Sequence, residues 1–208
     1  HELFRNRDTL ERFLDLAAQL PVPGPDSNWS ELSAAQLADH LTQGHRDFLT
    51  LTIPEIDGYF REWDSLDPEI TDLRDAFGVF VRGLRQEIET EETHFFPRVL
   101  RYEACLRDAA INPEFNGGSL RVAVAYRKSH APDLNPDRLG KLVERLADTH
   151  AVRDGNHWAE LLVTRLYDFH AQFLEHERLE SDVLYPMALE MERTLYNLSI
   201  AGLSAKAG

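Results

Sequence analysis

The sequence predicts an all-α protein, an antiparallel up-down four-helix bundle with a short N-terminal helical appendage. Three observations carry this prediction. Apolar residues recur at helical spacing over most of the 208 residues, and no convincing alternating strand pattern appears. The helical stretches are long and their connections are short, which is typical of helices packed antiparallel. A hydrophobic content of 43% with three tryptophans is sufficient for one packed core.

The chain divides into an appendage, residues 1–28, and the bundle, residues 29–208. In the appendage, an amphipathic stretch over Leu3–Leu20 ends at the proline-rich linker Pro21–Pro25. Prolines at this density make a stiff connection that cannot continue a helix. The appendage is therefore expected to be a helix of its own, packed on the bundle or on a second chain.

The first two bundle helices are each expected to be kinked at an internal proline. The first lies near Ser33–Phe60, where Pro54 predicts a kink. The second covers about Pro68–Arg107, with Asp67 as its N-cap, because aspartate is favoured at the cap and proline in the first turn. Pro97 predicts a kink in this second helix.

The third helix is expected to be interrupted and the fourth to be long. A helix near Leu120–His130 is followed by two prolines, and helical spacing resumes over Leu139–Leu146. After a turn at residues 154–156, the last helix spans roughly His157–Tyr196, with a kink at Pro186. These four stretches make up the expected bundle.

Charge and cysteine usage narrow the function. The net charge of −14 argues against binding to nucleic acid and to anionic membrane surfaces. No apolar run approaches the length of a membrane span. The single cysteine, Cys105, excludes an internal disulfide and suits a reducing compartment, so we expect a cytoplasmic protein.

The most informative residues are His176 and Glu180, four residues apart in the last helix. Residues at this spacing lie one above the other on one helix face. Here that face is the apolar stripe that runs through Phe169 and Phe173 to Leu184. Burying an imidazole and a carboxylate without partners costs several kcal/mol. A metal ion is the obvious compensation.

The second helix repeats this pattern with Glu87 and Glu91. In both helices the second polar residue stands five residues before an aromatic-proline step, Phe96-Pro97 here and Tyr185-Pro186 in the last helix. An acidic, solvated helix face is the alternative interpretation of the two glutamates. The repeat favours a dinuclear metal site, because a carboxylate can bridge two cations, and carboxylate and imidazole ligands suit iron or manganese.

The remaining ligands are predicted from the level along the bundle axis, because all ligands of one buried site must lie at the same height. This level is counted in residues from the ends of antiparallel helices. His176 lies about 19 residues into the last helix, and counting back from the end of the preceding helix points to His130. The same count applied to Glu87 points to a ligand in the first bundle helix, where His40 and His45 bracket the expected level. His45 continues the apolar stripe of its helix and is the preferred ligand, while His40, one turn away, is the alternative.

Two other histidines, His150 and His94, lie in the expected helices. His150 lies some 20 residues away from the level expected for a ligand, which is roughly 30 Å along a helix. We therefore expect a capping or core histidine there. His94 stands three residues after Glu91, a spacing that also occurs in di-iron bundles, and is the alternative to Glu87 as a ligand. The candidate metal ligands are therefore His45, Glu87, Glu91, His130, His176 and Glu180.

These motifs resemble the hemerythrin-like (HHE cation-binding) family, and within it the di-iron proteins that repair iron centres. The resemblance covers about Trp29–Glu190, and its strongest elements are His176-x-x-x-Glu180 before Tyr185-Pro186, and Glu91-Glu92 before Phe96-Pro97. It implies a four-helix bundle with two iron ions. It implies bridging carboxylates and terminal histidines at the following positions: Glu91, Glu180, His45, His130 and His176.

The chain departs from the family pattern at three places. Glu87 stands where the family usually has histidine, and an extra carboxylate favours a metal of higher charge, admits manganese or zinc, or reflects loss of the original activity. The prolines after His130 are unusual in a ligand helix. The segment before Trp29 lacks the cysteine pair that repair proteins often carry.

The expected function is that of a non-haem di-iron protein that reacts with O2, peroxide or nitric oxide, in stress defence or iron-centre repair. The second hypothesis is an O2 or redox sensor, or an iron-binding module without turnover. The third hypothesis is a degenerate bundle without metal. The sequence does not decide whether the protein is an enzyme, and it leaves the oligomeric state open, with a homodimer as one option.

Overall fold

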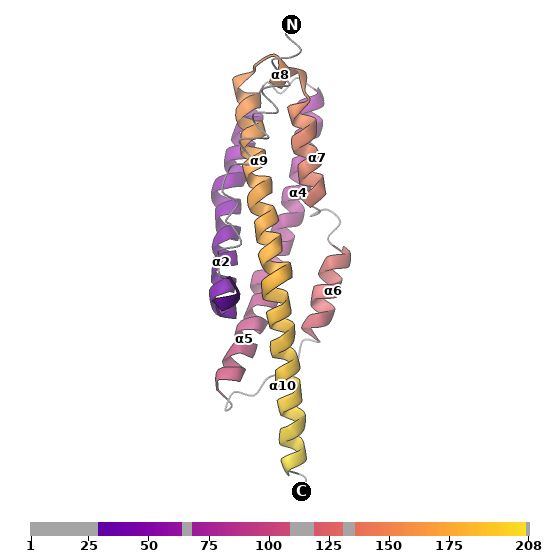
Figure 1. Ribbon diagram of the computed structural model, residues 1–208. Helices are drawn as coiled ribbons and strands as arrows, with labels where there is room; N and C mark the ends of the chain where they lie inside the picture. The colour runs from indigo at the N-terminus through magenta and orange to yellow at the C-terminus, as the bar shows by residue number, and fades with distance from the viewer. Residues whose placement is uncertain (1–28, 64–67, 109–118, 131–135, 207–208) are drawn as a thin grey trace.

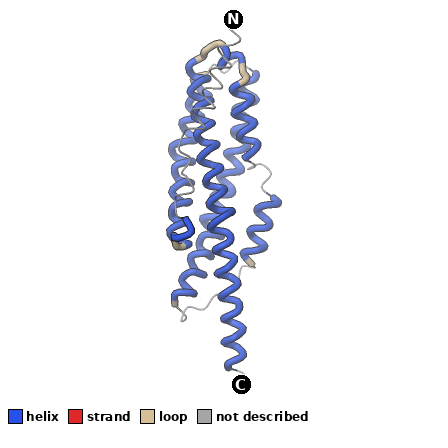
Figure 2. The backbone as a smooth tube through the Cα atoms, viewed as in Figure 1, coloured by secondary structure: helices blue, strands red, loops and turns tan. Residues whose placement is uncertain are grey.

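The structure is a computed structural model, and it describes residues 29–63, 68–108, 119–130 and 136–206. Within these ranges nearly every residue is helical and no strand occurs. The long helices lie side by side along one axis (Figures 1 and 2). The all-α class is thus confirmed, while the expected appendage lies outside the described residues. None of the described helices combines the length and the apolar character that a membrane span needs.

The first arm begins with a short 3-10 helix, η1 (Trp29–Glu31), and continues as α2 (Ala34–Asp47), η2 (Phe48–Thr52) and α3 (Ile53–Glu62). Ser33 is the N-cap of α2. Its hydroxyl accepts from the backbone of Gln36, and the Gln36 side chain accepts from the backbone of Ser33. This reciprocal capping box explains why the helix starts there.

The second arm runs in the opposite direction as α4 (Pro68–Thr90), η3 (Glu91–Phe95) and α5 (Phe96–Arg107). Its expected N-cap, Asp67, lies outside the described residues. Glu103 on α5 accepts a hydrogen bond from the backbone of Ala35, which fastens the second arm to the start of α2.

The third arm consists of two pieces, α6 (Leu120–His130) and α7 (Pro136–Ala147), as the two prolines predict. A one-turn helix, α8 (His150–Arg153), follows at the upper end in Figure 1. The chain then reverses at Gly155, whose positive φ of 76° is open to glycine without strain.

The fourth arm is the longest and consists of α9 (His157–Arg178), η5 (Leu179–Leu184) and α10 (Tyr185–Lys206). Asn156 caps it by accepting from two backbone N–H groups. The expected end at Tyr196 was wrong, because the helix continues to its last described residue. No proline interrupts this stretch, and its alanine and leucine residues favour helix.

Three prolines predicted kinks, and the structure accommodates each with a π-helical turn directly before it. Proline lacks an N–H, and its ring clashes with the carbonyl four residues back. In a π turn the residue before the proline bonds five residues back, so one extra residue widens the helix at this point. The three bonds run from the backbone N–H of Ile53 to the carbonyl of Phe48, from Phe96 to Glu91, and from Tyr185 to Glu180.

The apolar core consists of two clusters, one above the other. The upper core gathers residues of α3, α4, α7 and α9, with Phe77 and Phe169 at its centre. The lower core gathers residues of α2, α5, α6 and α10, with Tyr102, Leu184 and the buried free thiol of Cys105. Three arms pass from one core to the other within the following intervals: Leu41 to Phe48, Ile88 to Phe95, and Phe173 to Leu179.

Candidate metal centre

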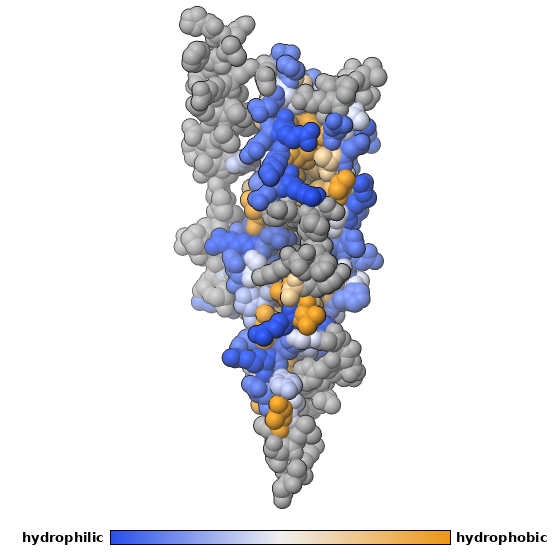
Figure 3. Space-filling view, turned by 90° about the vertical axis from the view of Figure 1, so that its right-hand side faces the viewer, coloured by the Kyte–Doolittle hydropathy of each residue, from blue (hydrophilic) through white to orange (hydrophobic). Residues whose placement is uncertain are grey.

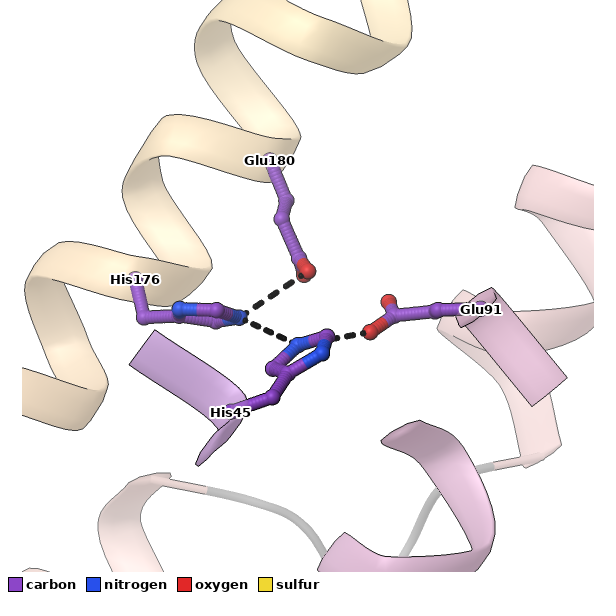
Figure 4. Close-up of side chains that lie close together, drawn as sticks. All are labelled: His45, Glu91, His176 and Glu180. Carbon is purple, nitrogen blue, oxygen red and sulfur yellow. Dashed lines mark hydrogen bonds and ion pairs between the residues drawn. The ribbon is translucent and has the colours of Figure 1, made fainter. Parts of the chain in front are cut away.

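Four buried polar side chains occupy the level between the two cores. His45, Glu91, His176 and Glu180 are 1%, 3%, 8% and 0% exposed. Each offers one ligand atom, and these atoms all lie within 4.8 Å of one another. They come from three arms and point toward one another (Figure 4). The cluster can hold a metal ion.

The distances define two histidine–carboxylate pairs that meet at the imidazoles. Nε2 of His45 lies 3.0 Å from Nε2 of His176. The same His45 atom lies 3.3 Å from Oε2 of Glu91, and Nε2 of His176 lies 3.2 Å from Oε1 of Glu180. Two imidazole nitrogens and two carboxylate oxygens thus converge. This donor set suits iron, manganese or zinc and neutralises a divalent cation, so the residues fit the expected metal.

Helix geometry accounts for the convergence. His176 and Glu180 lie on one face because they are four residues apart at the junction of α9 and η5. Glu91 is the first residue of the π turn η3 and Glu180 is the second residue of η5. π turns inside α-helices are frequent at functional sites, where they re-aim side chains.

Glu92 orients the His45 ring from the other side. Its Oε1 lies 2.9 Å from Nδ1 of His45, so a proton on Nδ1 is donated to Glu92 and Nε2 is left for the cluster. Burial by itself lowers the pKa of His45. Its hydrogen bonds with Glu91 and Glu92 and the negative charge of Glu180 outweigh burial, and the pKa is raised overall.

Tyr185 joins the two carboxylates. Its hydroxyl lies 3.2 Å from Oε1 of Glu91 and 3.4 Å from Oε2 of Glu180. These are the oxygens that do not face the histidines. Because the hydroxyl donates on this side, the other oxygen of each glutamate is turned toward the imidazoles.

Aromatic rings close the site on the imidazole side. Phe96 stacks on His45, with ring centroids 5.8 Å apart and an interplanar angle of 7°. Phe48 meets His176 edge-on at 5.5 Å. A Cβ at Gly44 would lie 3.2 Å from Nδ1 of His176, so glycine leaves room for that ring.

Two expected ligands are not part of the four. Glu87 is half-buried on α4, one turn before Glu91, and lies outside the group of converging ligand atoms. His130 is the last residue of α6, but its side chain lies outside the described residues. A role for either as a ligand stays a prediction.

The alternative histidines lie away from the cluster. His40 is exposed and contacts the ring of Trp29 at 4.8 Å, so the structure brings His45 and not His40 to the site. His94 is exposed, with Nδ1 at 2.6 Å from the hydroxyl of Thr93. His150 is outside the cluster, as expected, but it is exposed at the start of α8 rather than in the core.

Sequence reasoning missed the supporting residues Gly44, Glu92 and Tyr185. Tyr185 entered only as part of an aromatic-proline step. The available signal was its hydroxyl, which the equivalent Phe96 of the repeat lacks.

Comparison of the chain with protein-family models, with curated proteins and with solved structures finds no match. A metal centre is therefore indicated by the side chains themselves.

Proposed function

We propose that the chain is a cytoplasmic, hemerythrin-like four-helix bundle of up-down topology that holds two iron ions. Its centre reacts with or binds O2, peroxide or nitric oxide, in stress defence or iron-centre repair. The observation that carries the proposal is the buried cluster of two histidines and two glutamates, contributed by three arms at one level. The resemblance of the ligand motifs to that family adds the bundle topology and the second ion.

One ion would be bound by the four converging atoms of His45, Glu91, His176 and Glu180. The resemblance implies that Glu91 and Glu180 would also serve the second ion. Glu87 and His130 would complete its ligands, one from α4 and one from the end of α6. An extra carboxylate at Glu87 makes manganese or zinc an alternative to iron.

Iron, when bound, supplies one-electron chemistry toward a small oxidant or a diatomic molecule. The chain's own residues position and protect the centre. Glu92 holds the proton of His45 at Nδ1, and Tyr185 directs its hydroxyl proton at the two glutamates. Phe48 and Phe96 cover the imidazoles and exclude water from that side.

Metal analysis of the purified chain, combined with an ultraviolet-visible spectrum, tests the proposal. We expect two irons per chain and charge-transfer absorption. One ion per chain would support the four-residue centre and contradict the dinuclear site. A stable protein without any metal would rule out a metal function and leave a structural bundle.

A binding module without turnover, such as an O2 or redox sensor or an iron store, is the second candidate. The depth of burial favours it, since Glu180 is 0% and His45 is 1% exposed and small molecules reach such a site slowly. Peroxide consumption and nitric oxide reduction by the reduced protein decide between the two. Multiple turnovers support the reactive protein, and a single stoichiometric reaction supports the sensor or store.

A further inference from the structure

A surface hollow of about 420 Å³ lies between α4 and α7, outside the candidate metal centre. Its floor is apolar and includes Val79 and Phe80 of α4 and Leu139 and Leu142 of α7. None of its eight lining residues is acidic. The volume falls within the range of about 300–1,000 Å³ that is usual for small-ligand sites.

Three cationic side chains line the same hollow from one side. Arg138, Lys141 and Arg145 follow one another on α7 at spacings of three and four residues, which places them along one helix face. All three are exposed, and neither Lys141 nor Arg145 forms an ion pair with a described residue. In a chain of net charge −14, this is a local concentration of positive charge beside apolar surface.

Figure 3 looks at the face of the molecule that carries α6 and α7. In its upper half, apolar surface is bordered by strongly hydrophilic side chains. The lining of the hollow contains both kinds of side chain, apolar ones from α4 and α7 and cationic ones from α7. Its ligand should therefore carry both an anionic group and an apolar body.

We propose that this hollow binds a single-chain anionic amphiphile, a fatty acid. Its carboxylate meets Lys141 and Arg145, and its alkyl chain lies on Val79, Phe80 and Leu142. A small inorganic anion would leave the apolar floor in water, and a neutral hydrocarbon would make no use of the cations. A fatty acid satisfies both parts of the site.

This site goes beyond the proposed metal function and stands or falls independently of it. Its lining residues belong to α4 and α7, and none of them is among the four clustered side chains. Binding can therefore be measured on protein with or without metal.

Isothermal titration calorimetry with decanoate, below the concentration at which it aggregates, tests the proposal on the full chain. We expect saturable binding of decanoate, at least about tenfold weaker binding of decanol, and no measurable binding of propionate. The double variant Lys141→Glu/Arg145→Glu should weaken decanoate binding about tenfold, the size expected for two exposed ion pairs. Ala76→Trp, a substitution at an exposed lining residue, should fill the hollow and weaken binding of both long-chain ligands.

Arg85→Glu is the matched control, because Arg85 is exposed on α4 but does not line the hollow. This variant changes the net charge by as much as either of the two substitutions in the double variant. It should leave decanoate affinity unchanged. Far-ultraviolet circular dichroism and thermal unfolding verify that each variant folds. Equal affinity for decanol and decanoate, an equal loss in the Arg85 variant, or the absence of saturable decanoate binding would each overturn the proposal.

Discussion

A single hydroxyl, that of Tyr185, lies between the two glutamates of the cluster. It is 3.2 Å from Oε1 of Glu91 and 3.4 Å from Oε2 of Glu180. Tyr185→Phe removes this donor and leaves the ring packed against Phe95, so the fold should persist. We expect metal affinity to fall about 10–100-fold, as is usual when a hydrogen bond to a ligand is lost. Competition with a chelator measures the loss.

Tyr196→Phe is the matched control for that variant. Tyr196 lies on the same helix, is 57% exposed and is distant in sequence from the cluster. Its hydroxyl should not affect metal affinity. Equal affinities of the Tyr185 variant and the wild-type protein would contradict the positioning role.

Two helical glycines separate the effect of helix propensity from that of space at the site. A Cβ added at Gly58 has no neighbouring atom within 4 Å. Gly58→Ala should therefore raise the free energy of unfolding by about 0.5–1 kcal/mol, because alanine favours helix more than glycine does. Gly44→Ala adds a Cβ 3.2 Å from Nδ1 of His176 and should displace that ring. We expect this variant to lose metal affinity and to gain less stability than Gly58→Ala. Urea unfolding and chelator competition on both variants check this, and unchanged metal affinity in Gly44→Ala would count against the cluster as a metal site.

Residues of the cluster differ in how far sequence predicts them. His176 and Glu180 interrupt an apolar stripe of their own helix, so local periodicity is sufficient to indicate both. His45 needed the additional argument from helix level. Tyr185 and Gly44 act across arms, on Glu91 and on the His176 ring, and such contacts depend on packing distances that no periodicity contains.

At the scale of elements, the sequence shows three prolines that interrupt long helices, but it does not show how the helices accommodate them. The prolines predicted kinks, whereas each follows a π turn. A π turn differs from an α-helix by one inserted residue. Apolar residues in an amphipathic helix already recur at spacings of either three or four, so one extra residue cannot be recognised in that pattern. The turn matters for the site because Glu91 and Glu180 accept the widened hydrogen bonds through their carbonyls.

The start of α6 depends on one carboxylate from another arm. Glu192 on α10 accepts from the backbone N–H of Leu120 at 2.7 Å and from the hydroxyl of Ser119 at 2.7 Å. Glu192→Ala leaves the first N–H group of α6, that of Leu120, without this partner, at a cost of about 1–3 kcal/mol to that helix. We expect faster amide hydrogen exchange over Leu120–His130 and unchanged exchange in α9. Glu190→Ala, at an exposed position on α10, is the control. Uniform exchange changes throughout the chain would refute a local role.

Asp168 lies on α9, which packs against α3, and the surroundings of its carboxyl group disfavour the charged form. Burial raises the pKa of Asp168, Arg165 lowers it, and Glu55 raises it, with a net rise. A carboxyl with a raised pKa in the folded state stabilises the fold at low pH, and this contribution is lost as pH rises through the folded pKa. Asp168→Asn should therefore be more stable than wild type at pH 7, by less than about 1 kcal/mol because solvent screens the site.

Urea unfolding at pH 7 and at pH 4.5 checks this sign. The gain in the Asp168 variant should shrink as the pH falls, because the wild-type carboxyl becomes protonated. Asp39→Asn, at an exposed position on α2, should leave the unfolding midpoint unchanged at both values. A gain that grows toward low pH would show the opposite shift.

At the scale of the whole molecule, the polar cluster separates the upper core from the lower core. Each of three arms crosses from one core to the other at this level. The crossing intervals contain His45, Glu91 and His176, and Glu180 follows directly after the last interval. Level counting along antiparallel helices, started from Glu87, pointed to the level at which His40 and His45 lie. The same counting pointed to His130 on the third arm, whose side chain lies outside the described residues, so that ligand stays a prediction.

Metal binding at this level should stabilise the whole molecule, because the ion would join three arms. A ligand that binds only the folded state at 100 times its dissociation constant adds about 2.7 kcal/mol, which corresponds to about 5–10 °C in Tm for a chain of this size. Thermal unfolding with saturating Fe²⁺ under anaerobic conditions, and with a chelator, measures the shift. Glu180→Ala should abolish it by removing a ligand from the centre. His150→Ala, at an exposed residue far along the chain from the cluster, should retain it in full. A shift that survives in the Glu180 variant would place the metal elsewhere, and loss of the shift in the His150 variant would overturn the helix-level argument.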